Sequence, residues 1–102
     1  MRLRNLNGSG EQFPNPVCPC RTWIEHWNEN RYPKKDKKAG FCRGCNKKTS
    51  DLVGGHIIKI GTEDRCRYIV PLCSSCNNTK NLEFEVKESD LVSANCENCC
   101  NN

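Results

Sequence analysis

The chain has 102 residues, of which 35% are hydrophobic and ten are cysteine, and its formal net charge is +4. A domain of this size has a small core and usually needs disulfides, bound metal or a partner chain to remain folded. It lacks the roughly 18 consecutive apolar residues of a membrane-spanning helix and the apolar core of a secretory signal. We therefore expect a soluble chain in a reducing compartment, cytoplasmic or nuclear, whose cysteines bind metal.

Residues 1–17 are rich in Asn, Gly and Pro and have no apolar periodicity. This composition predicts a flexible tail. No internal repeat follows it, so residues 18–102 are expected to form a single domain.

A helix is expected over about residues 22–31. Thr22 and Glu25 have the spacing of a capping box, in which each side chain accepts a hydrogen bond from the backbone at the other's position. Trp23 and Trp27 would lie on one face of this helix. A short helix with two tryptophans on one face must pack against the rest of the chain.

The sequence of residues 41–88 predicts, in order, a turn, a hairpin, a short helix and a strand. FCRGCNKK at 41–48 is typical of a tight turn, and the β-rich runs at 52–60 and 67–72 predict the hairpin. The polar segment at 73–81 suits the start of a short helix. Apolar and charged residues alternate at 82–88, which predicts the strand.

Two C-x-x-C pairs flank the expected hairpin, Cys42 with Cys45 and Cys73 with Cys76. Zn²⁺ takes four thiolates in a tetrahedron, and two intervening residues let a turn direct both sulfurs at one ion. A disulfide within a pair is the redox alternative, but that arrangement is typical of a single pair beside a βαβ unit. We therefore expect a structural zinc ion at these four cysteines, and a small α+β domain stabilised by it.

Three segments of this region resemble the HNH, or His-Me finger, endonucleases. They are CRGC at 42–45, LVGGHIIKI at 52–60 with His56 late in the run, and IVPLCSSCNNTK at 69–80. The resemblance covers residues 41–82. It implies a treble-clef zinc fold with a ββα core, here with an additional N-terminal helix and a C-terminal strand and tail.

By this resemblance His56 would be the general base that activates water, and Asn77 would help to hold Mg²⁺ or Mn²⁺ on the scissile phosphate. The chemistry is sound, because a neutral imidazole can accept a proton from water and a divalent cation stabilises the developing charge. The family places a second cation ligand directly before the base, where this chain has Gly55. Two other interpretations of His56 stay open: a structural imidazole in the hairpin, and a zinc ligand.

A second zinc site is expected to join the two ends of the chain. Its candidate ligands are Cys18, Cys20, His26 and one tail cysteine, for which Cys100 is preferred over Cys99 and Cys96. A C-x-C pair, a later histidine and a distant cysteine can complete a tetrahedron. The same outer segments resemble small HNH-like proteins of microbes and viruses, which implies an intracellular or virion-associated protein. The alternative is that His26 is an ordinary surface histidine and the tail thiols are free.

Positive charge is concentrated between residues 31 and 48, and the sign reverses after Glu83. Such a run can bind the phosphates of DNA or RNA. The alternative is a solvated loop that keeps a small protein soluble. The candidate nucleic-acid contacts are Arg31, Lys34, Lys35, Lys37, Lys38, Arg43, Lys47 and Lys48.

Three functions remain open at this point. The chain could be a nuclease that uses Mg²⁺ or Mn²⁺, a module that binds nucleic acid without cutting it, or a structural adaptor with a protein partner in a nucleoprotein or viral assembly. The leading hypothesis is a zinc-stabilised, HNH-like protein that contacts nucleic acid. A divalent-metal-dependent endonuclease, which hydrolyses phosphodiester bonds, is the catalytic form of this hypothesis.

Overall fold

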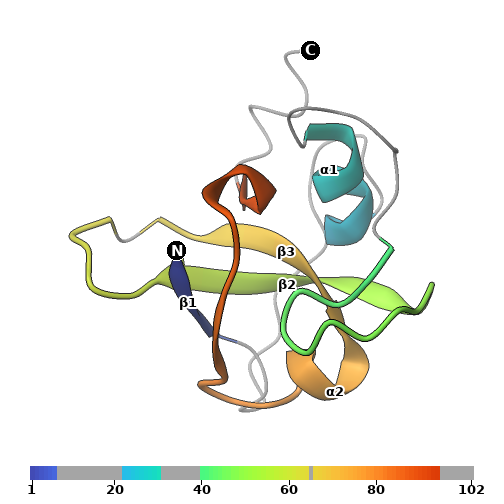
Figure 1. The fold of residues 1–102 in the computed structure, drawn as a ribbon. Coiled ribbons are helices and arrows are strands. Elements are labelled where there is room, and N and C mark those ends of the chain that lie inside the picture. Colours follow the sequence, from blue (N-terminus) through green and yellow to red (C-terminus); the bar gives the residue numbers. More distant parts are fainter. Residues whose placement is uncertain (7–21, 31–39, 65, 95–102) are drawn as a thin grey trace.

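The computed structural model describes residues 1–6, 22–30, 40–64 and 66–94. This part of the chain is an α+β structure with a five-stranded antiparallel sheet in the order β4-β1-β2-β3-β5 (Figure 1). The elements are β1 (Arg2–Asn5), α1 (Trp23–Asn30), β2 (Leu52–Lys59), β3 (Tyr68–Cys73), α2 (Ser74–Asn77), β4 (Glu83–Glu85), the 3₁₀ helix η1 (Glu88–Asp90) and β5 (Val92–Ser93). None of the helices described is long and apolar enough to cross a membrane.

The predicted hairpin is confirmed as β2 and β3, which lie at the centre of the sheet. Their pairing runs without interruption from Leu52 opposite Cys73 to Ile57 opposite Tyr68. The register passes straight through Gly54 and Gly55, so the two glycines do not mark a bulge.

Both glycines instead allow close approach of other groups, one on each face of β2. A Cβ atom at Gly54 would lie 2.6 Å from the backbone carbonyl carbon of Trp23, and a Cβ atom at Gly55 would overlap the side chain of Leu72. Since successive residues of a strand point to opposite faces, Gly54 faces α1 and Gly55 faces the other side. Figure 1 shows α1 and α2 on either side of the central strands.

The predicted helix is confirmed as α1, which begins one residue later than expected, while Arg31 lies outside the described residues. The backbone N–H of Glu25 donates to the Thr22 hydroxyl oxygen at 3.3 Å, as expected for the capping residue. Trp27 is buried against Ile69 and Val92 on the face of the sheet that α1 covers. The two tryptophans therefore dock this helix, as the sequence predicts.

The flexible tail predicted for residues 1–17 is wrong for Arg2–Asn5, which form β1 between β2 and β4. Leu3 and Asn5 are fully buried, and Leu3 lies opposite Lys59 on one side and Phe84 on the other. A four-residue strand with one apolar side chain has too little periodicity to be detected in sequence. Residues 7–17 lie outside the described part.

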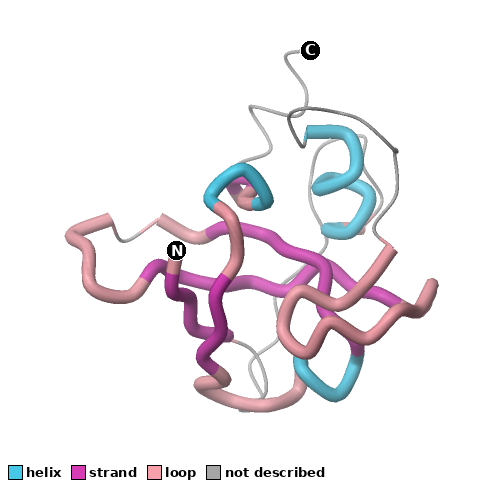
Figure 2. Tube along the Cα trace, viewed as in Figure 1, coloured by secondary structure: helices cyan, strands magenta, loops and turns pink. Residues whose placement is uncertain are grey.

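The second core lies on the sheet face opposite α1 and includes Leu3, Ile57, Leu72 and Phe84 together with three of the cysteines. In Figure 2 the loop of residues 40–51 lies beside α2 and the end of β3. The backbone N–H of Arg43 donates to Pro71 O at 2.9 Å, which fixes this loop against the edge of β3. The fold thus brings the two C-x-x-C segments together at one end of the hairpin.

Candidate metal centre

The four cysteines predicted to bind zinc converge in space. The sulfur atoms of Cys42, Cys45, Cys73 and Cys76 all lie within 4.8 Å of one another, and those of Cys45 and Cys73 are 3.9 Å apart. A tetrahedral zinc ion with Zn–S bonds of about 2.3 Å places its sulfurs about 3.8 Å apart. The donor set and its spacing therefore fit one Zn²⁺ ion with no open coordination position, as in a structural site.

The first pair lies in the knuckle, which we define as residues 41–48. Phe41 and Lys48 form an isolated antiparallel bridge, and Cys42 N–H donates to Lys47 O at 2.8 Å. Asn46 closes the turn with a φ angle of 65°, a left-handed conformation that asparagine tolerates better than most residues. This geometry directs both knuckle sulfurs to the same side.

The second pair lies at the junction of β3 and α2. Cys73 is the last residue of β3, and Cys76 is buried within α2. Gly44 permits the two pairs to approach, because a Cβ atom there would lie 3.1 Å from the sulfur of Cys76. The backbone N–H of Gly44 also donates to the sulfur of Cys42 at 3.3 Å. Backbone hydrogen bonds and the close approach at Gly44 therefore help to direct both pairs toward one point.

Protonation of the cluster shows why a cation is needed. Burial raises the pKa of Cys42, but hydrogen bonds from the backbone at Cys73, Cys45 and Gly44 outweigh that effect and lower it to about 7. Burial and hydrogen bonds to the other three thiols raise the pKa of Cys76 well above its ordinary value. Four thiolates this close do not all ionise unaided, whereas a dication compensates their mutual repulsion.

The disulfide alternative is not supported in the described part of the chain. All five cysteines described there, including both members of each C-x-x-C pair, are free thiols. The fifth, Cys66, is exposed in the β2–β3 loop and does not belong to the cluster.

Asn5 supports the cluster, and sequence analysis missed it. The two N–H bonds of its side-chain Nδ2 are shared among three carbonyl oxygens at the end of α2, those of Cys76 at 3.1 Å, Asn77 at 2.9 Å and Thr79 at 3.0 Å. The residue is fully buried. One amide from β1 therefore contributes hydrogen bonds to the carbonyls of the segment that carries Cys76, the last cysteine of the cluster. A polar residue between Arg4 and Leu6 is the only trace of this role in sequence.

Arg43 was predicted to contact nucleic acid, and the structure contradicts this. The residue is 6% exposed, and its Nε lies 3.3 Å from Asp90 Oδ2. Its Nη1 donates to Phe41 O at 2.7 Å, and the guanidinium carbon lies 3.9 Å from the centre of the Phe41 ring and 5.1 Å from that of Trp27. Because this cation is enclosed by an acidic partner and two rings, it ties the knuckle to η1 and α1 instead of facing solvent.

The structure does not bring the two predicted catalytic residues together. His56 is 5% exposed and lies on the α1 side of β2, where its ring contacts Trp23 edge-on with centroids 4.9 Å apart. Asn77 lies on the opposite side, with its Oδ1 3.2 Å from where a Cβ atom of Gly55 would be. That Oδ1 is buried and has no hydrogen-bond partner among the described residues. Burial and the nearby positive charge of Arg67 lower the pKa of His56 from 6.5 to about 4, so the ring is neutral at pH 7.

Of the predicted second zinc site, only His26 lies in the described part of the chain. It is fully buried, unlike the surface histidine considered as the alternative, and its Nε2–H donates to Ser93 O at 2.8 Å. The other candidates, Cys18, Cys20, Cys96, Cys99 and Cys100, lie outside the described residues. The second site therefore remains a prediction.

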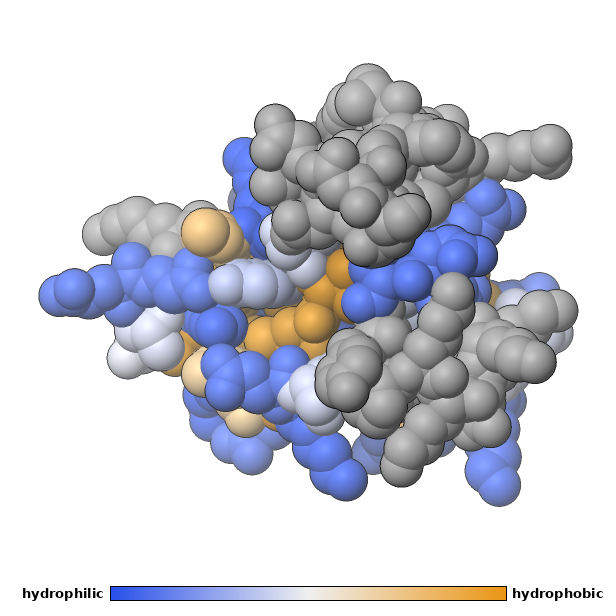
Figure 3. Space-filling view, turned by 90° about the horizontal axis from the view of Figure 1, so that it is seen from above, coloured by the Kyte–Doolittle hydropathy of each residue, from blue (hydrophilic) through white to orange (hydrophobic). Residues whose placement is uncertain are grey.

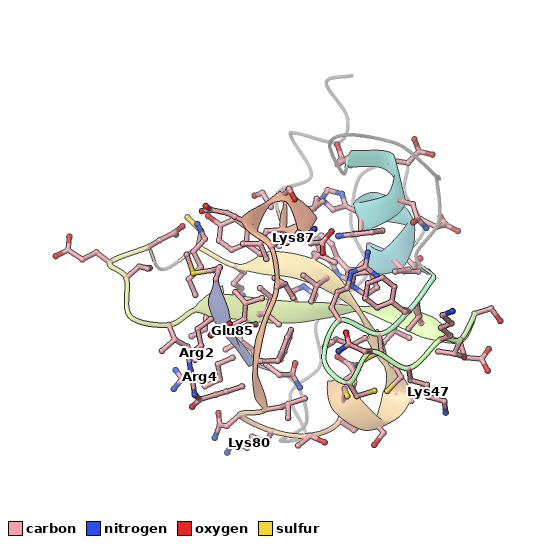
Figure 4. All side chains as sticks on the ribbon, in the orientation of Figure 1. Arg2, Arg4, Lys47, Lys80, Glu85 and Lys87 are labelled. Atoms are coloured by element: carbon pink, nitrogen blue, oxygen red, sulfur yellow. The ribbon has the colours of Figure 1, made fainter. Side chains whose placement is uncertain are left out.

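Two of the predicted nucleic-acid contacts, Lys47 and Lys48, are described and exposed. In Figure 4 Lys47 lies at the end of the molecule that carries the cysteine sulfurs and α2, away from Arg2 and Arg4 on β1. Arg2 is paired with Glu83 at 2.9 Å, so the β1–β4 surface is of mixed charge. Hydrophilic side chains surround a small apolar area on the face shown in Figure 3. The remaining candidates are outside the described residues: Arg31, Lys34, Lys35, Lys37 and Lys38.

Comparison with known proteins found no match of any kind. No family model matches the chain, and the searches of curated proteins and of solved structures found no match.

Proposed function

We propose that the chain is a zinc-stabilised module with an HNH-like, treble-clef order of elements, which binds nucleic acid through its knuckle and does not cut it. The order of knuckle, hairpin and second cysteine pair at a helix start supports the treble-clef assignment. The proposal that the protein does not cleave nucleic acid rests on the positions of His56 and Asn77, which lie on opposite faces of β2.

A catalytic HNH site requires the base and the cation to act on the same phosphate. Here the imidazole packs against Trp23, while the Asn77 oxygen lies across the strand. A pKa near 4 also makes His56 a weak base at neutral pH. A cation ligand at position 55 would collide with Leu72, so the missing family ligand has a steric explanation.

Nucleic-acid binding is supported by the lysines of the knuckle. Lys47 and Lys48 are exposed beside the zinc ligands and follow the basic run of residues 31–38 in sequence. Binding that depends on such side chains weakens steeply as the salt concentration rises. Each phosphate contact makes the slope of log K against log salt more negative by about 0.7 to 0.9.

The test is a nicking assay and a gel-retardation assay on the zinc-loaded protein. Supercoiled plasmid is incubated with Mg²⁺ or Mn²⁺, with His56→Ala in parallel, and labelled oligonucleotides are titrated at 50 and 200 mM salt. We expect salt-sensitive retardation and no nicking. Nicking by the wild type that His56→Ala abolishes would show an enzyme and contradict the proposal.

The matched variants locate the surface. Lys47→Ala with Lys48→Ala removes both knuckle lysines, and Lys87→Ala removes one exposed lysine that lies away from the knuckle (Figure 4). The double variant should lose affinity and salt slope, whereas Lys87→Ala should retain both. No retardation of any oligonucleotide at low salt would exclude nucleic-acid binding and leave the adaptor function.

A further inference from the structure

A small cavity opens directly beside the metal centre. Its volume is about 210 Å³, and its lining residues are Lys47, Thr49, Asp51, Cys73, Ser74 and Ser75. One wall is the segment that leaves the knuckle, and the other is the β3–α2 junction. Both walls adjoin zinc ligands, so zinc binding holds the cavity open in one shape.

The lining is polar and carries one charge of each sign. Among the described residues, neither the Lys47 ammonium nor the Asp51 carboxylate has a hydrogen-bond or ion-pair partner. The Thr49 hydroxyl accepts a hydrogen bond from Asp51 N–H at 3.0 Å, which leaves its own proton available to donate. The cavity thus offers a cation, a carboxylate and three hydroxyl groups to a ligand.

This combination restricts the chemistry of the ligand. A bare phosphate would be attracted by Lys47 but repelled by Asp51 and by the zinc–thiolate cluster, whose formal charge is negative. A simple cation would be repelled by Lys47. A ribose–phosphate unit presents both complementary groups, an anionic phosphodiester for the lysine and a 2′-hydroxyl that can donate to the carboxylate.

We propose that this cavity binds one ribose–phosphate unit of RNA, with Lys47 on the phosphate and Asp51 accepting the 2′-hydroxyl. The inference rests on the proposed nucleic-acid function and names its substrate class. DNA can satisfy Lys47 but leaves Asp51 without a donor. The extra contact to the carboxylate therefore favours RNA over DNA.

The experiment compares three single-stranded oligonucleotides of one sequence: RNA, DNA with deoxyuridine in place of thymidine, and 2′-O-methyl RNA. Affinity for the zinc-loaded protein is measured by fluorescence anisotropy. RNA should bind about tenfold more tightly than DNA, since one hydrogen bond to a charged acceptor distinguishes them. The 2′-O-methyl RNA, which lacks the donor, should bind like DNA.

Two variants assign the roles. Asp51→Ala should remove the preference, weakening RNA binding while DNA binding stays equal or improves as a negative charge is lost. Lys47→Ala should weaken RNA and DNA alike and reduce the salt slope by about 0.7. Zinc content and circular dichroism of each variant establish that it is folded. The ligand series tests the same contact without any change to the protein.

The outcomes separate this inference from the function on which it rests. Equal affinity of the wild type for RNA and DNA overturns the ribose contact and leaves the nucleic-acid function standing. A preference for RNA that Asp51→Ala leaves unchanged also overturns it. Binding of none of the three oligonucleotides overturns both.

Discussion

Arg43 illustrates how the role of one residue depends on what lies across the fold. In sequence it is one of eight basic residues between positions 31 and 48. In the structure it is buried against Asp90 and stacked on Phe41. Burying a guanidinium costs free energy unless it is paired and hydrogen-bonded, and the acidic partner of Arg43 is 47 positions away in the chain. Removing either member would break this buried ion pair, which typically costs about 3 to 5 kcal/mol.

His56 has a pH dependence that can be measured. Its pKa is about 4 in the folded chain and 6.5 as the ordinary value, so the unfolded chain binds the additional proton between these limits. The free energy of unfolding therefore falls as the pH decreases from 6.5 to 4, by up to about 3 kcal/mol. His56→Gln should lack this component, as measured by urea denaturation at a series of pH values.

Zinc ligands also take up protons in acid, but this occurs equally in the wild type and in His56→Gln. The difference between the two curves isolates the imidazole. Parallel curves from pH 4 to pH 7 would show that His56 is not buried in its neutral form.

At the level of elements, the position of α1 depends on one glycine of β2. The helix backbone at Trp23 occupies the space that a side chain at Gly54 would need. This close approach brings the Trp23 ring against both His26 and His56, with centroids 5.2 and 4.9 Å apart. The helix thus covers the residue that the HNH resemblance assigns as the base.

Gly54→Ala should displace α1 and lower the free energy of unfolding by about 1 to 3 kcal/mol, the usual cost of overpacking. Gly40→Ala is the matched control, because a Cβ atom there has nothing within 4 Å. Its effect should stay within about 0.5 kcal/mol. Urea denaturation followed by tryptophan fluorescence measures both, and equal effects of the two substitutions would contradict the packing argument.

At the level of the whole molecule, the metal centre joins segments that the sheet alone would leave separate. The knuckle precedes the hairpin and α2 follows it, yet all four sulfurs lie within 4.8 Å. Structural zinc can contribute on the order of 10 kcal/mol of folding free energy, which is comparable to the whole stability of a small domain. We therefore expect the chain to unfold when zinc is removed.

Two exposed cysteines provide the comparison. Cys45→Ser should lose zinc and most of the circular dichroism signal, whereas Cys66→Ser, equally exposed but outside the cluster, should retain both. Native mass spectrometry counts the zinc bound to each variant. A well-folded Cys45→Ser protein without zinc would exclude a structural role for the metal. Two zinc ions on the wild type would support the second site predicted at His26 and the outer cysteines.

The amino-acid sequence by itself determined the features that depend on local spacing. The C-x-x-C pairs identified the four sulfurs, alternation of β-rich runs and turns identified β2 and β3, and the capping pair identified α1. Each of these signals lies within a few consecutive residues, where backbone geometry alone relates the side chains.

Only the tertiary structure decided what depends on contacts between distant segments. It placed β1 inside the sheet, directed the Asn5 amide to carbonyls more than 70 positions away and buried Arg43 against Asp90. It also put His56 and Asn77 on opposite faces of β2. The physical reason is that burial and pairing are properties of the packed chain, so a residue type and its neighbours in sequence do not specify them.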